Sequence, residues 1–236
     1  PIFSLKHREK CFYFWVWDYI VNNTPKCIEL TLEHIFIVGL ACSLAIVIGV
    51  PIGVAITRNK NLASKVINTA NIFMTTPSIA LFGIMIPLLA PFGHGLGKVP
   101  AITALVLYSQ LPIIRNTYVA IQNVPPELVD AGRGLGMTSW QRLKEIEIPL
   151  AVPVIIAGLR TAAVMSIGIA AIAAYIGAGG LGVLIQQGIG RSYEPMILTG
   201  ALLVSVLAIF VDGFMAGLES LVTPKGIKVG RRLRHG

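Results

Sequence analysis

Five apolar segments, each about long enough to cross a lipid bilayer, constrain this chain more than any other feature of its sequence. The hydrocarbon core of a bilayer is about 30 Å thick, and a helix needs about 20 mostly apolar residues to cross it. The sequence therefore predicts an all-α integral membrane protein with about five transmembrane helices. The segments lie at roughly 34 to 56, 66 to 91, 99 to 121, 150 to 174 and 196 to 218.

The composition agrees with a membrane protein and leaves no room for a second folded domain. Of the 236 residues, 55% are hydrophobic and 13% are charged, whereas an ordinary soluble domain has about 25% charged residues. The mean hydropathy is +0.76. The formal net charge is +8, but the basic residues stand in short flanks between apolar runs, where they act as topology signals. We therefore expect contact with membrane lipid and no nucleic acid partner.

The distribution of Lys and Arg predicts the orientation of the chain, because basic flanks favour the cytoplasmic side. The loops at 92 to 98 and 175 to 195 carry one basic residue each, which suits the outer face. The N-terminus is then outside and the C-terminus, with a basic tail at 225 to 236, is cytoplasmic; the basic residues before residue 11 oppose this orientation. The expected cytoplasmic flanks contain Arg58, Lys60, Lys65, Lys225, Lys228, Arg231, Arg232 and Arg234.

The first 33 residues form a separate N-terminal segment, ahead of a transmembrane domain at 34 to 224. Residues 11 to 21 are too short to cross a bilayer, and Trp15 and Trp17 favour the headgroup level. We expect an interfacial helix there; the alternative is a remnant of a sixth crossing. Thr31 to His34 are plausible capping residues for the first span.

Proline interrupts the second apolar segment. Pro77 follows Thr75 and Thr76 and precedes Ser78, so the helix should kink or unwind there. The break is either a kink packed by neighbouring helices or part of a substrate pathway, since freed backbone groups are tolerated where they line a cavity. Tyr108, an aromatic residue inside the third segment, is a further candidate for the lining of such a pathway.

The longest internal polar stretch lies at 122 to 149, between the third and fourth spans. Pro125 and Pro126 favour the start of a helix, and Glu127 suits its N-terminal end. Glycines at 132, 134 and 136 end that helix quickly. The stretch therefore predicts a short cytoplasmic helix and a tight turn, suited to docking a partner.

The same stretch resembles the EAA loop of bacterial ABC-importer permeases, through Asp130, Ala131 and Gly132, then Gly136, then Ile146, Ile148 and Pro149. In that family the loop forms a coupling helix that sits in a groove of the ATPase subunit. The resemblance implies a coupling role for Glu127, Asp130, Ala131, Gly132, Gly136 and Met137.

Over roughly residues 18 to 224 the chain resembles the permease family of osmoprotectant importers. The resemblance is carried by TTPSIALFGIMIPLL, GKVPAITALVLYSQLPIIRNTY, AGRGLGMTSWQ and IGAGGLGVLI. It implies a type I ABC-importer permease in the bacterial cytoplasmic membrane, moving glycine betaine, carnitine or choline by alternating access. The implied partners are a second, identical or similar permease chain, an ATP-binding cassette ATPase and an extracytoplasmic substrate-binding protein. The alternatives are a methionine-type permease and an ATP-independent secondary carrier.

Charged residues inside spans are costly and need partners. Asp212 is expected to pair with Arg160 or Arg115, with Arg160 the favoured partner and Arg115 extending toward the headgroups. The segment at 176 to 190 is too rich in glycine for a stable helix, and it predicts an outer loop in which Gly179 and Gly180 form a gate on the substrate pathway.

No catalytic machinery is visible in the sequence. It contains no phosphate-binding loop, no metal-ligand cluster and no nucleophile beside a base. We therefore expect no enzyme activity and no cofactor in this chain, with ATP and Mg bound by the partner ATPase. The four histidines are interpreted as solvent or interface residues; they are His7, His34, His94 and His235.

Overall fold

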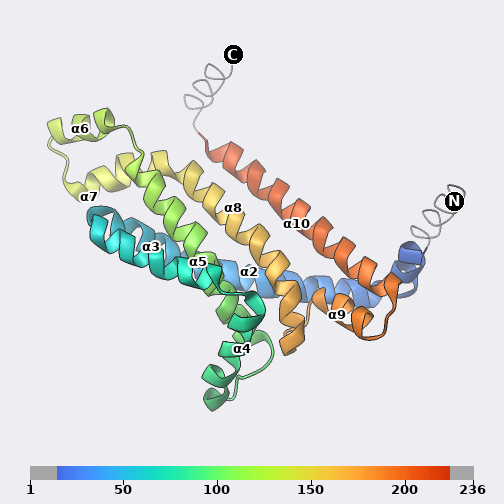
Figure 1. The fold of residues 1–236 in the computed structure, drawn as a ribbon. Helices are drawn as coiled ribbons and strands as arrows, with labels where there is room; N and C mark the ends of the chain where they lie inside the picture. Colours follow the sequence, from blue (N-terminus) through green and yellow to red (C-terminus); the bar gives the residue numbers. More distant parts are fainter. Residues whose placement is uncertain (1–14, 224–236) are drawn as a thin grey trace, which may run out of the picture. The chain divides into compact units, whose positions relative to one another are not determined.

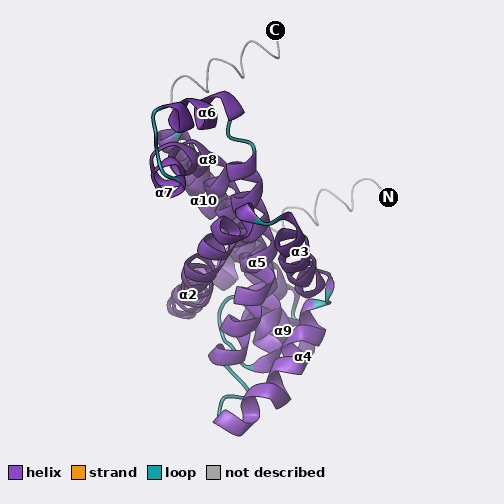
Figure 2. Ribbon diagram, turned by 90° about the vertical axis from the view of Figure 1, so that its left-hand side faces the viewer, coloured by secondary structure: helices purple, strands orange, loops and turns teal. Residues whose placement is uncertain are grey.

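The computed structural model describes residues 15–223, and every regular element within that range is a helix (Figure 1 and Figure 2). The all-α prediction is therefore confirmed. The basic tail and the residues before Trp15 lie outside the described range. The elements are α2 (Thr24–Ala55), η1 (Ile56–Arg58), α3 (Lys60–Thr75), α4 (Ser78–Leu89), η2 (Ala90–Phe92), α5 (Lys98–Gln122), α6 (Pro126–Gly134), α7 (Ser139–Arg142), η3 (Leu143–Glu147), α8 (Ile148–Ile172), η4 (Ala173–Ile176), α9 (Gly182–Gly190) and α10 (Glu194–Val222).

The chain divides into two compact units, each built from three separate stretches of sequence. Unit 1 contains Thr76–Val106, Met165–Phe210 and the described residues up to Ala41. Unit 2 contains Cys42–Thr75, Leu107–Val164 and the described residues from Val211 onward. Each unit is described by itself below.

Three helical stretches of the described chain are long and apolar enough to cross a membrane, and a broken pair can supply a fourth. The three are Thr24–Arg58, Ser139–Ile176 and Glu194–Val222, and the broken pair is Lys60–Thr75 with Ser78–Phe92. Helix α5 occupies the remaining predicted segment and has 25 residues, enough to span about 37 Å at 1.5 Å per residue. Its polar residues, among them Ser109, Gln110 and Asn116, make it the least apolar of the five.

Helix α2 begins earlier than the sequence predicts. Residues 15–22 are helical, and α2 follows from Thr24, with Pro25 in its first turn, where proline is tolerated. Thr31 to His34 therefore lie inside a continuous helix, and their predicted capping role is wrong. The polar composition of this stretch does not end the helix, because one face of it, with Cys27, Leu30 and His34, is buried within unit 1.

The predicted break at proline is present. Helix α3 ends at Thr75, and Pro77 is the N-cap of α4 with φ −56° and ψ 135°. Proline restricts the residue before it to extended conformations, which ends α3 at this point.

The prediction that residues 176 to 190 contain no stable helix is wrong, because Gly182–Gly190 form α9. Helix α9 lies close to its neighbours in unit 1. A Cβ at Gly182 would lie within 3 Å of the Ala171 backbone, and one at Gly188 would lie 2.7 Å from Ile197 Cγ1. Close packing through glycines thus offsets the low helix propensity of this segment.

Replacing Gly182 by alanine is expected to destabilise the protein, because the added Cβ would overlap the main chain of Ala171, which cannot rotate away. Gly168 in α8 is the matched control, since a Cβ there meets nothing within 4 Å. Gly168→Ala should leave stability unchanged or raise it by about 0.5–1 kcal/mol. Thermal unfolding in detergent measures both; equal melting temperatures for the two variants would contradict the packing seen at α9.

Candidate functional site

Helix α6 in unit 2 ends in a turn that requires glycine. Gly136 has φ +76°, and its N–H donates to the Arg133 carbonyl at 2.9 Å. The Met137 N–H donates to the Gly132 carbonyl at 3.1 Å. These two hydrogen bonds form a Schellman motif, in which the residue after the C-cap is left-handed and usually glycine. The tight turn predicted after α6 is therefore present.

Gly132 lets α6 pack closely against the segment that follows it. A Cβ at Gly132 would lie 2.8 Å from Ile146 Cδ1 and 3.2 Å from both Arg142 Cγ and Met137 Sδ. Gly132 is buried, whereas Glu127, Asp130 and Ala131 are exposed. One side of α6 is thus seated on the chain and the other is free for a partner.

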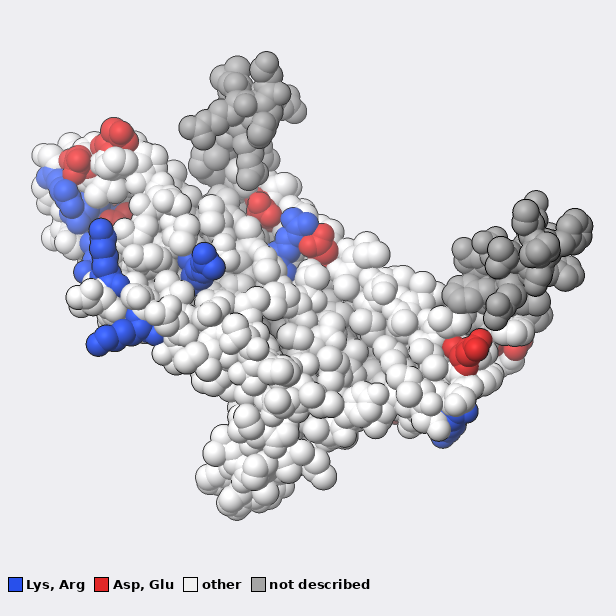
Figure 3. All heavy atoms as spheres, in the orientation of Figure 1, with Lys and Arg blue, Asp and Glu red and all other residues white. Residues whose placement is uncertain are grey.

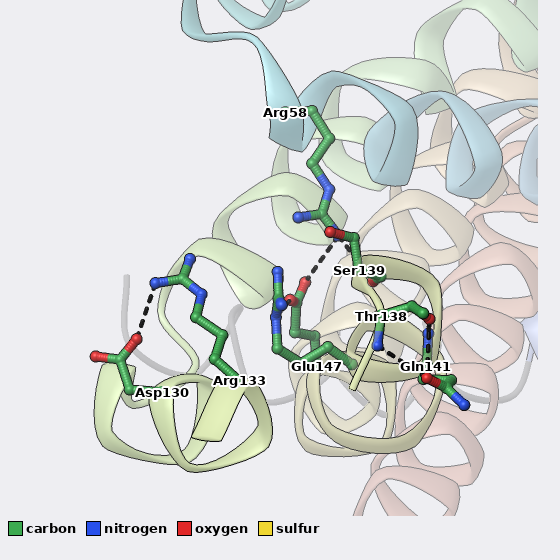
Figure 4. A network of polar contacts seen from close by, with 8 residues as sticks. Arg58, Asp130, Arg133, Thr138, Ser139, Gln141 and Glu147 are labelled. Carbon is green, nitrogen blue, oxygen red and sulfur yellow. Dashed lines mark hydrogen bonds and ion pairs between the residues drawn. The ribbon is translucent and has the colours of Figure 1, made fainter. Parts of the chain in front are cut away.

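The segment after α6 begins with a capping box and continues as a π-helix. The Thr138 hydroxyl accepts from the Gln141 N–H, and the Gln141 side chain accepts from the Thr138 N–H at 2.8 Å (Figure 4). The π-helix η3 then carries the chain into α8. Single-turn π-helical insertions occur frequently at functional sites.

Glu147 of η3 contacts two arginines in unit 2, Arg142 and Arg58, and Figure 4 shows Arg58 reaching toward it. Its carboxylate is 3.7 Å from Arg142 Nε and 3.8 Å from Arg58 Nη2. Arg58 also donates to the Ser139 carbonyl at 3.3 Å. Because Arg58 ends η1, these contacts join the end of the first span to α7 and η3. They border an open pocket of about 300 Å³, also lined by Thr57, Ile121, Gln122, Val124, Pro126, Val129, Asp130 and Arg133.

Neutralising Glu147 should weaken this junction. Glu147 and Arg142 are both about 7% exposed, so Glu147→Gln leaves a buried guanidinium without its counter-charge. Loss of one partner of a buried polar pair costs about 1–3 kcal/mol. We expect a lower melting temperature in detergent for Glu147→Gln and no change for Glu145→Gln, the control on the same π-helix, whose side chain is exposed. If Glu147→Gln and Glu145→Gln melt at the same temperature, the contacts of Glu147 do not stabilise the fold.

The outer surface of this region combines apolar and charged side chains. Leu135 is 83% exposed and Trp140 is 69% exposed. Asp130 and Arg133 form an exposed pair at 2.9 Å. On the face drawn in Figure 3, acidic and basic side chains gather over α6 and α7. Exposed aromatic and aliphatic residues beside paired charges are typical of a protein docking surface.

The structure brings together the two residues that the sequence pairs inside the membrane. Arg160 of α8 and Asp212 of α10 form a bidentate contact in unit 2, with Nε to Oδ1 at 2.5 Å and Nη2 to Oδ2 at 2.6 Å. Glu219 Oε2 lies 3.7 Å from Arg160 Nη1. Arg115, the alternative partner, is exposed.

The glycines of the predicted gate lie against α2 in unit 1. Gly179 and Gly180 have φ +87° and +74°. The Gly180 N–H donates to Glu33 Oε2 at 3.1 Å, and the Leu181 N–H donates to His34 Nδ1 at 3.2 Å. Residues 179–181, called the glycine segment below, are therefore attached to the first span by two adjacent side chains.

The other predicted pathway residues are divided between the two units. Thr76, Pro77 and Ser78 belong to unit 1, and Thr75 and Tyr108 belong to unit 2. Tyr108 is buried, at 4% exposure, so its ring packs within the chain. Their role in a substrate pathway stays a prediction.

Sequence reasoning missed several residues of these networks. His34 is fully buried, so its interpretation as a solvent or interface residue is wrong; His94 is exposed, as expected. Arg142 and Glu147 were also missed. They are five residues apart, a spacing that faces the same side only in a π-helix. For the contacts of Glu33 and His34 with Gly180 and Leu181, the sequence did offer a signal: two adjacent polar residues at the start of an apolar run.

Comparison with known proteins agrees with this geometry. The family described as "Binding-protein-dependent transport system inner membrane component" matches residues 45–224. The chain is 53% identical over 210 residues to the osmoprotectant import permease protein OsmW of Salmonella typhimurium, covering 89% of this chain and 98% of that protein. It is 45% identical over 210 residues to the glycine betaine/carnitine/choline transport system permease protein OpuCB of Bacillus subtilis, covering 89% and 94%.

A solved structure supports the same assignment. A chain of the MetNI methionine ABC transporter, in an inward-facing conformation, matches with a TM-score of 0.76 and 26% identity, covering 84% of this chain and 96% of that chain. The predicted ABC-importer permease fold is therefore confirmed. The family match covers well over half of the 236 residues, so this chain belongs to the inner membrane components of binding-protein-dependent transport systems and is a multi-pass permease subunit.

Proposed function

We propose that this chain is the permease subunit of an ATP-driven importer that moves quaternary-ammonium osmoprotectants such as glycine betaine, carnitine and choline. The observation that carries the proposal is the 53% and 45% identity, over 89% of the chain, to permeases named for these substrates. The methionine transporter chain has the same fold but is 26% identical, which favours the osmoprotectant class over the methionine class.

The region around α6 is the proposed docking site of the ATPase subunit. Its exposed Leu135 and Trp140 and the exposed residues Glu127, Asp130 and Ala131 offer the partner a mixed apolar and charged surface. Gly132 lets α6 pack against Ile146 of η3, with Met137 beside it, and Arg58 connects this region to the end of the first span. Movement of α6 with the ATPase would therefore pull directly on two membrane helices, as alternating access requires.

The proposal includes the orientation of the chain and its partners. In this proposal the α6 loop is cytoplasmic, as the basic flanks of the sequence favour, and Gly179 and Gly180 belong to an outer loop that acts as a gate for the extracytoplasmic binding protein. ATP and Mg bind to the ATPase, and a second permease chain completes the pathway between the two copies.

Uptake by proteoliposomes containing the permease, its ATPase and its binding protein tests the proposal. We expect uptake of labelled glycine betaine, carnitine or choline that depends on internal ATP. Uptake of methionine alone would move the chain to the methionine class, and uptake without ATP would indicate a secondary carrier.

A further inference from the structure

The Lys98 ammonium in unit 1 contacts both a carboxylate and an aromatic ring of α2. Lys98 Nζ lies 2.9 Å from Glu33 Oε1 and 6.0 Å from the centre of the Phe36 ring. Glu33 and Phe36 are one turn apart on α2, and Lys98 is the first residue of α5. An ammonium group is thus held by a carboxylate and an aromatic face together.

The Glu33 carboxylate is held in place by backbone as well as by Lys98. Its Oε2 accepts from the Gly180 N–H at 3.1 Å. A Cβ at Gly179 would lie 2.5 Å from the same oxygen, so a larger residue there would exclude the carboxylate. The carboxylate would therefore keep its position if Lys98 moved away.

His34 fixes the glycine segment that holds Glu33. The Leu181 N–H donates to His34 Nδ1, which makes Nδ1 an acceptor and leaves the proton on Nε2. His34 Nε2 then donates to the Ile167 carbonyl at 3.1 Å. His34 is fully buried, and through these two hydrogen bonds it connects α2 to α8 and to the glycine segment.

The side chains of Glu33, Phe36 and Lys98 are accessible. The side chains of Glu33 and Lys98 are 30% and 44% exposed, and Phe36 is 55% exposed. A carboxylate beside an aromatic face is the arrangement that recognises quaternary ammonium groups, which cannot donate a hydrogen bond and are bound by charge and by ring faces.

We propose that Glu33 and Phe36 form a subsite for the quaternary ammonium group of the substrate, and that the Lys98 ammonium is its internal competitor. This inference rests on the proposed function and adds the residues that recognise the substrate at the gate. When a zwitterion such as glycine betaine enters, its cation replaces Lys98 at Glu33, and its carboxylate pairs with the displaced Lys98. Both charges of the pair are then satisfied again, without a net change of charge in the site.

Choline lacks a carboxylate, so it would leave Lys98 without a partner. The subsite therefore predicts that Lys98 distinguishes zwitterionic from purely cationic substrates, whereas Glu33 serves both.

The test measures initial rates of uptake of glycine betaine and choline by the complete transporter at substrate concentrations well below saturation, where a lost substrate contact lowers the rate. Lys98→Met should lower glycine betaine uptake about tenfold relative to choline, since a hydrogen bond to a charged group is lost. Glu33→Gln can still accept from Gly180 but carries no charge, and it should lower uptake of both. The control Lys26→Met removes an exposed pair with Glu29 on the same helix and should change neither.

The outcomes separate this inference from the proposed function. Equal losses of both substrates in Lys98→Met would make the ion pair a structural tie and overturn the subsite, and so would unchanged uptake in Glu33→Gln. Both results require a wild-type transporter that imports quaternary amines with ATP. A wild type that imports neither would overturn the proposed function itself.

Discussion

Gly132→Leu is expected to abolish ATP-driven uptake while the permease still inserts into the membrane. The buried face of α6 rests on Ile146, Arg142 and Met137, and even a Cβ at Gly132 would lie 2.8 Å from Ile146. These neighbours are flexible side chains, so alanine is tolerated by small shifts. Leucine is too large for such shifts and would lift α6 away from η3. The ATPase could still contact α6, but its movement would no longer reach the spans.

Gly134→Leu is the matched control, because Gly134 is exposed and a Cβ there meets nothing within 4 Å. The measurements are uptake, the amount of permease in membranes, and ATP hydrolysis by the assembled transporter. We expect Gly132→Leu to hydrolyse ATP without substrate transport, and Gly134→Leu to transport. Equal loss of transport in both variants would mean that the exposed face of α6, and not its seating on the chain, decides coupling.

The main helices and two local breaks were predictable from the sequence, because they depend on local chemistry. A run of about 20 apolar residues must form a helix in a bilayer, where backbone groups find no other hydrogen-bond partners. Pro77 ends a helix and Gly136 permits a left-handed residue, and both effects act within a few residues. The contact between Arg160 and Asp212 was predictable for a related reason, since isolated charges in spans are rare and costly.

The features that escaped prediction depend on residues far apart in the sequence. The burial of His34 is decided by Ile167 and Leu181, more than 130 positions away. Helix α9 forms because Gly182 and Gly188 meet neighbouring main chain closely, and no propensity scale contains that contact. The pair Arg142 and Glu147 was hidden because η3 departs from the 3.6-residue period used to read the sequence.

Asp212→Asn is expected to reduce sharply the amount of folded permease that membranes yield. The change removes the negative charge from a bidentate contact and leaves the Arg160 guanidinium, in a membrane-spanning helix, with only the longer contact to Glu219. Glu219→Gln should have a smaller effect, because its carboxylate lies 3.7 Å from Arg160 and forms a single, longer contact. Detergent extraction followed by size-exclusion chromatography measures the monodisperse fraction of each variant.

The double variant Arg160→Met with Asp212→Leu, made together with Glu219→Gln so that Glu219 does not lose its own partner, distinguishes a cost of unpaired charge from a need for the pair itself. Replacing both partners of an ion pair by apolar residues is often neutral or stabilising, whereas removing one partner is not. We therefore expect the double variant to restore the monodisperse fraction that Asp212→Asn loses. If the double variant folds and also transports, the pair serves only to neutralise two charges in the membrane. If it folds without transporting, the contact between α8 and α10 also takes part in the transport cycle; if it does not fold, charge compensation is the wrong explanation for the pair.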